Sequence, residues 1–400
     1  MTEPFVGEIV AALQQGTPAE AERLCRAQLA QFPDDENLLL LLSISLQQQD
    51  RSAEAADGYA RLTQLFPRSA THWTNYASVL RLTGKLPEAA DAAATAIRLA
   101  PDDATHYVTL GLVQLQQGEH AAAQETLLKA CALAPDSPEA HIHAAGALIS
   151  VRDAQAYLLL RPWRSWLPIG LPELQVFLAH LLMTIGNAGD AYDVLVELSR
   201  RMPMYLPARL QLAALHERKN QLQSAESLLA DSAALYPAME PAARLEMAHL
   251  RGKLALRRGD LAQARTILDD AGPRTENDYA HHFVLAEIQD KLGDTTAAMQ
   301  SLAIAHAWQV KEGTPIAPAH FAPDAPIMPN AIGRLSIADY HAWPHLTTPQ
   351  SAQSPVFIVG FPRSGTTLLE QMLDAHPALQ SMDEQPFFTI LGNELAEHGL

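Results

Sequence analysis

The sequence predicts a mainly α-helical protein, in which a solenoid of paired helices is followed by the first βα unit of an α/β domain. Two observations predict this order. Prolines return at one constant interval through the first part of the chain, and the segment before each proline repeats as well. Near the other end, the apolar run Val356–Val359 leads into a glycine-bearing loop and then a stretch with helical spacing. A chain of 400 residues is also too long for one compact core, so we expect more than one domain.

The same interval relates prolines and alanines. The prolines are Pro33, Pro67, Pro101 and Pro135, and the alanines twelve residues before them are Ala21, Ala55, Ala89 and Ala123. This is the tetratricopeptide pattern, in which each unit of about 34 residues holds two antiparallel helices and a proline ends the second. The small alanine should let the second helix approach the first closely, and a large apolar residue three or four positions later should fill the remaining space.

The pattern continues beyond Pro135 with two irregularities. Residues 138–171 span one period but are degenerate, because Pro162 and the WRSW stretch stand where the second helix belongs. Pro203 and Pro237 keep the original phase, after which the phase slips by about five residues. Glycine–alanine pairs then mark two more units (Gly259 with Ala264, Gly293 with Ala298). We therefore expect about nine repeats over residues 2–312.

A solenoid of this kind presents a groove that is typical of binding sites for peptides or protein segments. The alternative interpretation is a structural spacer or an oligomerisation arm.

The helical pattern is expected to stop at Gln309, and a proline-rich linker is predicted over residues 313–355 because residues before prolines are pushed out of the helical region. Its apolar residues indicate a segment packed along a surface rather than a flexible tether.

Composition excludes several classes of protein. The net charge of −17 argues against nucleic acid and anionic membranes as partners, because both require basic patches. Cys25 and Cys131 form neither a metal-binding spacing nor a disulfide framework, and both are predicted to be buried and inert. No metal-ligand cluster is evident, so no metal is expected. The N-terminus lacks the basic start and apolar core of a signal peptide, and no apolar run approaches the ~20 residues that span a bilayer, so we expect a cytoplasmic protein.

The segment after residue 355 predicts an anion-binding loop. A buried strand, the loop GFPRSGTT and a helix N-terminus together aim backbone N–H groups and a helix dipole at one point. Gly360 and Gly365 have the spacing of the nucleoside-triphosphatase loop, but Thr366 stands where that loop has its lysine. Arg363 supplies a cation from within the loop instead, which disfavours a nucleoside triphosphatase.

The run PRSGTTLLEQMLDAHP resembles the 5′-phosphosulfate-binding loop of sulfotransferases, on a P-loop-like fold. It is most similar to the tyrosylprotein sulfotransferases and their bacterial relatives with N-terminal tetratricopeptide repeats. The resemblance covers residues 355–392, and residues 356–400 would be the N-terminal part of a sulfotransferase domain. Eukaryotic Golgi enzymes of this type need a membrane anchor, so the resemblance favours a bacterial, cytoplasmic setting.

The resemblance implies 3′-phosphoadenosine 5′-phosphosulfate as the co-substrate and a hydroxyl-bearing acceptor. Arg363 would neutralise the 5′-phosphosulfate, and the following residues would bind it through N–H and hydroxyl donors (Ser364, Gly365, Thr366 and Thr367). In-line transfer would be stabilised electrostatically, as in phosphoryl transfer. The alternative for Arg363 is a surface salt bridge.

The resemblance also implies a catalytic base. Alignment through LDAHP places Glu384 at the position of the catalytic glutamate, with Asp383 before it and Gln385 where the family has threonine. A carboxylate can accept the acceptor's hydroxyl proton. The alternative is that Glu384 is a solvated loop residue.

The predicted function is sulfuryl transfer to a hydroxyl, with protein tyrosine as one candidate acceptor and with the repeats binding a protein partner or the acceptor. The alternative is a non-catalytic tetratricopeptide scaffold for protein–protein interaction.

Only one βα unit and the start of another segment follow Pro355, and the donor's 3′-phosphate site has no counterpart before Leu400. We therefore expect these 400 residues to belong to a longer enzyme. The chain alone should bind the donor weakly and turn over nothing measurable in an assay with labelled donor. Robust sulfuryl transfer by this chain would contradict the expectation.

Overall fold

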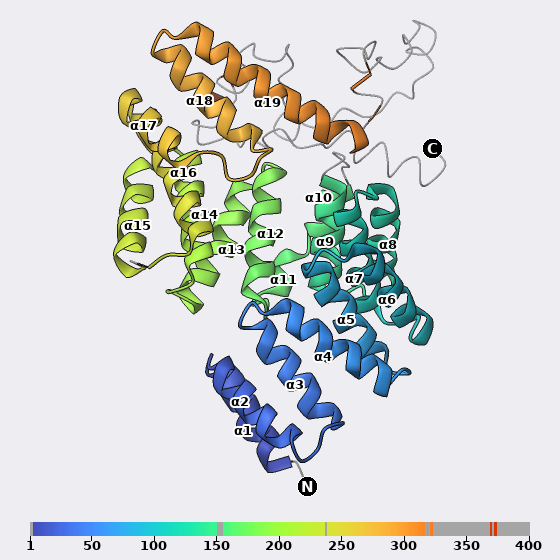
Figure 1. Ribbon diagram of the computed structural model, residues 1–400. Helices are drawn as coiled ribbons and strands as arrows, with labels where there is room; N and C mark the ends of the chain where they lie inside the picture. Colours follow the sequence, from blue (N-terminus) through green and yellow to red (C-terminus); the bar gives the residue numbers. More distant parts are fainter. Residues whose placement is uncertain are drawn as a thin grey trace, which may run out of the picture. The chain divides into compact units, whose positions relative to one another are not determined.

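The computed structural model describes residues 3–149, 155–236, 238–316, 318, 321–322, 369 and 372–373. These residues are mainly α-helical, and successive helices run in opposite directions beside one another (Figure 1). The first helices are α1 (Glu3–Gln14), α2 (Pro18–Leu29), α3 (Glu36–Gln47), α4 (Ser52–Leu65), α5 (Ala70–Leu82), α6 (Leu86–Leu99), α7 (Ala104–Gln117), α8 (His120–Leu133) and α9 (Pro138–Ile149). The remaining helices are α10 (Gln155–Leu160), α11 (Trp163–Trp166), α12 (Pro172–Thr184), α13 (Ala188–Arg201), α14 (Leu206–Arg218), α15 (Leu222–Leu235), α16 (Pro241–Arg258), α17 (Leu261–Ala271), α18 (Tyr279–Lys291) and α19 (Thr295–Ile316).

The turn inside each described helix pair has the same backbone conformation. A residue with positive φ ends the first helix, and the next residue donates its N–H to a carbonyl five positions back, as Glu119 does to Gln114 at 2.9 Å. This is the Schellman ending of a helix. The positive-φ residues of these turns are Gly16, Asp50, Gly84, Gly118, Gly186, Asn220, Gly259 and Gly293. Aspartate and asparagine are the residues that tolerate this conformation best after glycine.

The predicted role of the recurring alanine is confirmed by its burial. Ala21, Ala55, Ala89 and Ala123 are all fully buried, and so are their counterparts in α13, α15 and α17. The facing residue on the first helix is also small. A side-chain carbon added at Gly111 would lie 2.5 Å from Leu127, and one added at Gly252 would lie 2.8 Å from Leu268. Close approach of the two helices therefore requires small residues on both sides.

The turn between one unit and the next is closed by a side chain of the following helix. Trp73 donates its indole N–H to the carbonyl of Pro67 at 2.9 Å, and Tyr107 donates its hydroxyl to the carbonyl of Pro101 at 3.0 Å. In both cases the donor holds the same position relative to the proline. These bonds satisfy carbonyls that the end of a helix leaves without a partner.

In the unit over residues 138–171, the two short helices α10 and α11 stand where other units have one long helix. Tyr157 takes the place of the buried alanine and is half-buried, whereas Ala156 beside it is buried. The unit is joined to the next one by polar contacts. Asp190 accepts hydrogen bonds from the indole of Trp163 at 3.1 Å and from Arg164 at 2.6 Å. Arg201 also donates to the carbonyl of Ile169 at 3.0 Å, and within its own unit it bonds the fully buried Gln175 at 2.7 Å.

The slip of phase after Pro237 lies within a helix. Helix α16 has 18 residues, whereas the first helices of the other units have 12 to 14. The inserted residues extend α16 at its N-terminus, so the positive-φ residue Gly259 still ends it in register with the units before. Lengthening a helix satisfies the added backbone groups without enlarging a loop.

The chain divides into two units, Met1–Ser301 and Leu302–Leu400. Helix α19 continues to Ile316, so the expectation that the helical pattern stops at Gln309 was wrong. Pro315 lies in the last turn of the helix, and in that turn Thr314 donates its hydroxyl to the carbonyl of Val310 at 2.6 Å. The domain boundaries at 312 and 355 stay predictions, and the expected strand and anion-binding loop lie outside the described residues.

Both cysteines are free and buried, as predicted. Burial raises the pKa of the Cys25 thiol to about 12 and that of Cys131 to about 11, so both remain protonated and unreactive. No helix in the described part of the chain combines the length and the apolar character needed to span a bilayer.

Three histidines pack together near the connection between α17 and α18. The ring of His281 lies 5.2 Å from the rings of both His249 and His282, and His281 is only 4% exposed. Burial, together with the neighbouring His249 and His282, lowers the pKa of His281 to about 4, although Asp278 opposes the shift.

Gly118 and Asp50 provide a test of the turn conformation. Substitution Gly118→Ala should lower the free energy of unfolding by about 1 kcal/mol, because φ is +80° and an L side chain is strained there even with open space around it. Asp50→Gly at the equivalent turn should be neutral or stabilising. Urea unfolding followed by circular dichroism measures both, and equal effects of the two changes would contradict the assignment.

The histidine cluster predicts acid sensitivity. The folded pKa of His281 lies below the unfolded value of about 6.5, so the unfolded chain binds more protons between these values. The free energy of unfolding should therefore be highest above pH 6.5 and fall as the pH drops toward 4. The variant His281→Gln should reduce this slope by up to about 1.4 kcal/mol per pH unit, measured by urea titrations at several pH values. An unchanged slope would show that His281 does not titrate with unfolding.

Candidate functional site

The residues predicted to bind the donor and to act in catalysis lie outside the described residues. They are Arg363, Ser364, Gly365, Thr366, Thr367 and Glu384. Their assignment stays a prediction. The site that the described helices form is a cleft in the repeats.

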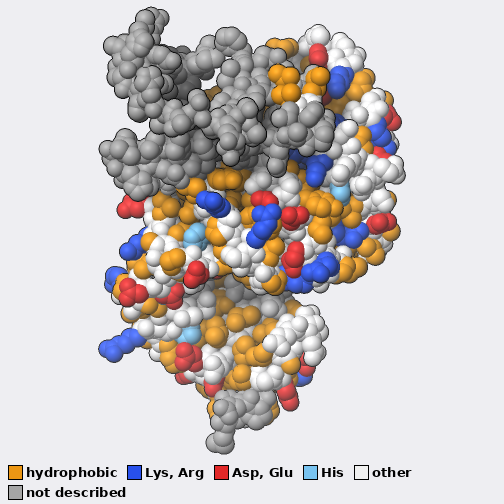
Figure 2. Space-filling model, turned by 180° about the vertical axis from the view of Figure 1, so that it is seen from behind, with side chains coloured by type: hydrophobic (Ala, Val, Ile, Leu, Met, Phe, Trp, Pro, Cys, Tyr) orange, Lys and Arg blue, Asp and Glu red, His pale blue; other side chains and the backbone are white. Residues whose placement is uncertain are grey.

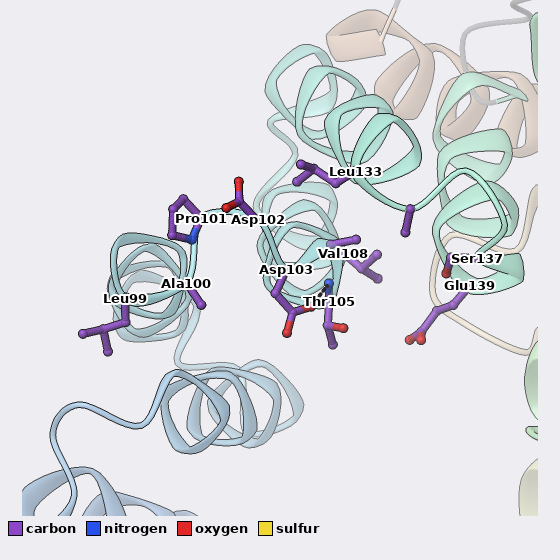
Figure 3. Close-up of a pocket in the computed structure, with 12 residues that line it drawn as sticks. Leu99, Ala100, Pro101, Asp102, Asp103, Thr105, Val108, Leu133, Ser137 and Glu139 are labelled. Carbon is purple, nitrogen blue, oxygen red and sulfur yellow. Dashed lines mark hydrogen bonds between the residues drawn. The ribbon is translucent and has the colours of Figure 1, made fainter.

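A cleft of about 710 Å³ lies between two successive unit-to-unit turns (Figure 3). One side is formed by the end of α6, the turn Pro101–Asp103 and the start of α7. The other side is formed by the end of α8, Ser137 and the start of α9. We call it the Leu99–Leu133 cleft, after the leucines that end α6 and α8. The two turns are equivalent positions of successive units.

The lining of this cleft is partly apolar. Leu99 is 40% exposed, which is high for a leucine at the end of a packed helix, whereas Val108 on α7 is buried. Leu133 holds the same position one repeat later, and Leu65 holds it one repeat earlier and is also 40% exposed. The end of the second helix thus presents an exposed leucine in the two units that end at Leu65 and Leu99, whereas Leu133 is half-buried.

Carboxylates flank the apolar lining. Asp103 and Glu139 stand on the two sides of the cleft and project in the same direction, whereas Asp102 projects away from them (Figure 3). Asp103 accepts a hydrogen bond from the backbone N–H of Thr105 at 2.9 Å and caps α7. Burial alone would raise the pKa of Asp103, but the hydrogen bonds of Thr105 and the charge of His106 lower it on balance.

Glu139 lies in the first turn of α9, where the helix dipole favours a negative charge. Burial nevertheless raises the pKa of its carboxyl. In the described part of the chain, no hydrogen bond or ion pair is formed by Glu139, and the cleft lining contains no lysine or arginine. The carboxylate is therefore partly removed from water without a compensating cation.

A second cavity of about 210 Å³ lies between α15, α16 and α17. Arg258 and Glu226 both line it and pair with one another. Arg251 lines it as well. The Leu99–Leu133 cleft has more than three times this volume and is the stronger candidate for a binding site.

The chemistry of the Leu99–Leu133 cleft suits binding rather than catalysis. Its lining offers carboxylates, hydroxyls and aliphatic side chains, but no histidine, cysteine or lysine. Within the described ranges, no group of three or more His, Cys, Asp or Glu side chains is arranged to hold a metal ion. On the face shown in Figure 2, basic and acidic side chains are interspersed with hydrophobic ones.

Sequence reasoning did not identify this cleft. A signal was present, because leucine stands two residues before the proline in the segments ending at Pro67, Pro101 and Pro135. Periodicity alone does not reveal that Leu65 and Leu99 are exposed while Leu133 is half-buried. A leucine in a helical repeat is usually assigned to the core.

Comparison with known proteins agrees with the fold. Tetratricopeptide-repeat family models match residues 40–104, 84–138 and 247–270. The solved structure of the APC/C hetero-tetramer Cut9–Hcn1 is similar with a TM-score of 0.56 and 15% identity, over 75% of this chain and 58% of that chain. A tetratricopeptide repeat protein from Parabacteroides merdae ATCC 43184 is similar with 16% identity and a TM-score of 0.36, over 76% of this chain and 98% of that chain. The described part of this protein is a tetratricopeptide-repeat solenoid.

The model of the sulfotransferase family matches residues 355–398. The chain thus combines tetratricopeptide repeats with a segment of the sulfotransferase family near its C-terminus. An uncharacterized protein of Aquifex aeolicus (strain VF5) is 24% identical over 230 residues, which make up 54% of this chain and 27% of that protein. The chain therefore spans about a quarter of the length of this curated relative.

The desolvated Glu139 carboxyl predicts a pH-dependent difference between the protein and Glu139→Gln. Because the folded pKa is raised, the folded state holds the proton above the pH at which the unfolded state releases it. The protein should lose stability relative to Glu139→Gln as the pH rises from 4 to 7. Thermal unfolding of both proteins across this range tests it. A constant difference in melting temperature would show that the carboxyl is not desolvated.

Proposed function

We propose that this protein is a 3′-phosphoadenosine 5′-phosphosulfate-dependent sulfotransferase whose repeats bind a protein partner or acceptor. The observation that carries the proposal is the match of residues 355–398 to the sulfotransferase family. That match includes the whole RSGTT loop and the carboxylate that follows it. Scaffolding does not require these residue types together, so the match favours the enzyme over a repeat-only scaffold.

The proposed reaction moves a sulfuryl group from the donor to an acceptor hydroxyl, with protein tyrosine as the acceptor considered first. The oxygen–sulfur bond to the acceptor forms while the bond between sulfur and the phosphate oxygen breaks. The acceptor's proton passes to Glu384, and 3′-phosphoadenosine 5′-phosphate leaves. Arg363 and the N–H donors of the loop stabilise the charge on the sulfuryl oxygens and the departing phosphate, which is the electrostatic part of catalysis.

The proposal also covers the boundaries of the domains and the location of the protein in the cell. The repeats would occupy residues 2–312, a proline-rich linker residues 313–355, and the sulfotransferase domain would begin at residue 356. A cytoplasmic location forms part of the proposal. The high net negative charge of the chain means that the anionic donor must be held by local groups such as Arg363 against an unfavourable long-range field.

Calorimetric titration of 3′-phosphoadenosine 5′-phosphate into the protein at its natural length tests the donor site. We expect binding in the micromolar range, about −8 kcal/mol, that Arg363→Ala abolishes because the loop loses its cation. Glu384→Gln is the matched control, since it keeps the loop intact and should leave donor-analogue binding unchanged. Failure of the folded protein to bind, or equal binding by Arg363→Ala, would favour the scaffold.

A further inference from the structure

We propose that the Leu99–Leu133 cleft binds a lysine or arginine side chain of a partner protein segment, held between the carboxylates of Asp103 and Glu139 while a neighbouring apolar residue packs on Leu99. This inference rests on the proposal that the repeats bind a protein partner or acceptor. It adds the location of the contact and the chemical class of the segment. Three features of the cleft lead to it.

The first feature is the shape and character of the lining. A volume of about 710 Å³ exceeds what one water molecule or ion needs and suits two or three amino-acid side chains. Of the lining residues, Leu99 on α6 presents 40% of its surface to solvent, and Val108 on α7 is 3% exposed. Covering Leu99 would remove apolar surface from water, which favours a partner with an aliphatic or aromatic residue.

The second feature is the arrangement of charge. The Asp103 and Glu139 carboxylates lie on opposite sides of the cleft and project in the same direction (Figure 3). Asp103 uses one oxygen to cap α7, and a carboxylate has about four acceptor positions, so it can accept further hydrogen bonds. A guanidinium or ammonium group placed between the two carboxylates would neutralise both.

The third feature is the lack of an internal cation. The lining residues include no lysine or arginine, and nearby Arg98 donates instead to the hydroxyl of Thr95 at 2.9 Å. The described residues therefore leave Glu139 without a positive partner at a site where burial disfavours its charged form. A bound cationic side chain would reverse that cost, because an opposite charge within a few ångströms favours the ionised carboxylate.

The charge and the lining of the cleft favour a basic segment over acidic segments, purely apolar segments and small cations. An acidic segment would be repelled by the rim of the cleft, and a purely apolar segment would leave Glu139 desolvated and unpaired. A small cation such as Mg²⁺ requires several oxygen ligands in near-octahedral geometry, which two carboxylates from separate units do not supply. A segment with a basic residue next to an apolar one satisfies both the charge and the exposed leucine.

The test uses a fluorescein-labelled Leu-Arg-Leu peptide amide as the probe and a Leu-Glu-Leu peptide amide as its charge-reversed control. Fluorescence anisotropy with the protein at its natural length should show saturable binding of the first peptide and at least about tenfold weaker binding of the second. Binding should weaken with added salt, because the contact is electrostatic and partly exposed.

Matched variants assign the binding to this cleft. Glu139→Gln and Leu99→Ser should each weaken binding of the Leu-Arg-Leu peptide by about tenfold, because one removes the charge and the other the apolar contact. Glu173→Gln and Leu235→Ser change the same repeat positions outside the cleft and should keep the affinity within about twofold. Circular dichroism confirms that each variant is folded, and Glu139→Asp should restore part of the affinity if Glu139→Gln removes it.

Equal binding of the two peptides, or equal losses in the cleft variants and their controls, would overturn the inference. Titration of 3′-phosphoadenosine 5′-phosphate into the same preparations separates it from the proposed function. Donor-analogue binding without peptide binding would reject the cleft and leave the sulfotransferase proposal standing. Peptide binding that depends on Glu139, without donor-analogue binding, would support the cleft in a scaffold protein.

Discussion

The close approach of two helices within each repeat is the constraint on which the described structure depends. A fully buried alanine on the second helix and a small residue on the first allow this approach, and the positive-φ turn between them fixes its direction. Every other feature follows from repeating that contact. The tight turn fixes where the first helix ends, and a proline follows the second helix in most units. In two units an aromatic side chain donates a hydrogen bond to the carbonyl of that proline. A unit that loses the alanine, as at Tyr157, also loses the single long second helix.

The solenoid tolerates irregularity because each unit contacts mainly its neighbours. The extra residues lengthen α16 at its N-terminal end, so the turn that follows the helix keeps its conformation. The unit over residues 138–171 contacts the next unit through polar side chains, for example through the hydrogen bond from Trp163 to Asp190. The buried network of Gln175 holds the two helices of its own unit together, and Arg201 extends it to the carbonyl of Ile169 in the preceding unit.

The two proposed activities differ in where their support lies. The donor site depends on a short, specific run of residues. Its anion-binding role can be inferred from the sequence alone, because an anion needs N–H donors and a cation close together. The cleft depends on side chains such as Leu99 and Glu139, which belong to no known binding motif. In the combined picture, the repeats present a protein segment and the C-terminal segment supplies the group-transfer chemistry, which would link a binding surface to an enzyme in one chain.

The sequence by itself determined the repeat period, the positions of the turns and the burial of the alanines, because each of these depends on interactions within a single repeat. It also indicated the sulfotransferase-like loop through residue identity, although Arg363 and Glu384 lie outside the described residues. Only the tertiary structure decided which leucines are exposed, how the unit over residues 138–171 is built, where α19 ends, and which histidines meet. The Leu99–Leu133 cleft belongs to this second group. It arises from the space between two units, and spacing between packed elements is set by side-chain volumes on several helices rather than by a local pattern.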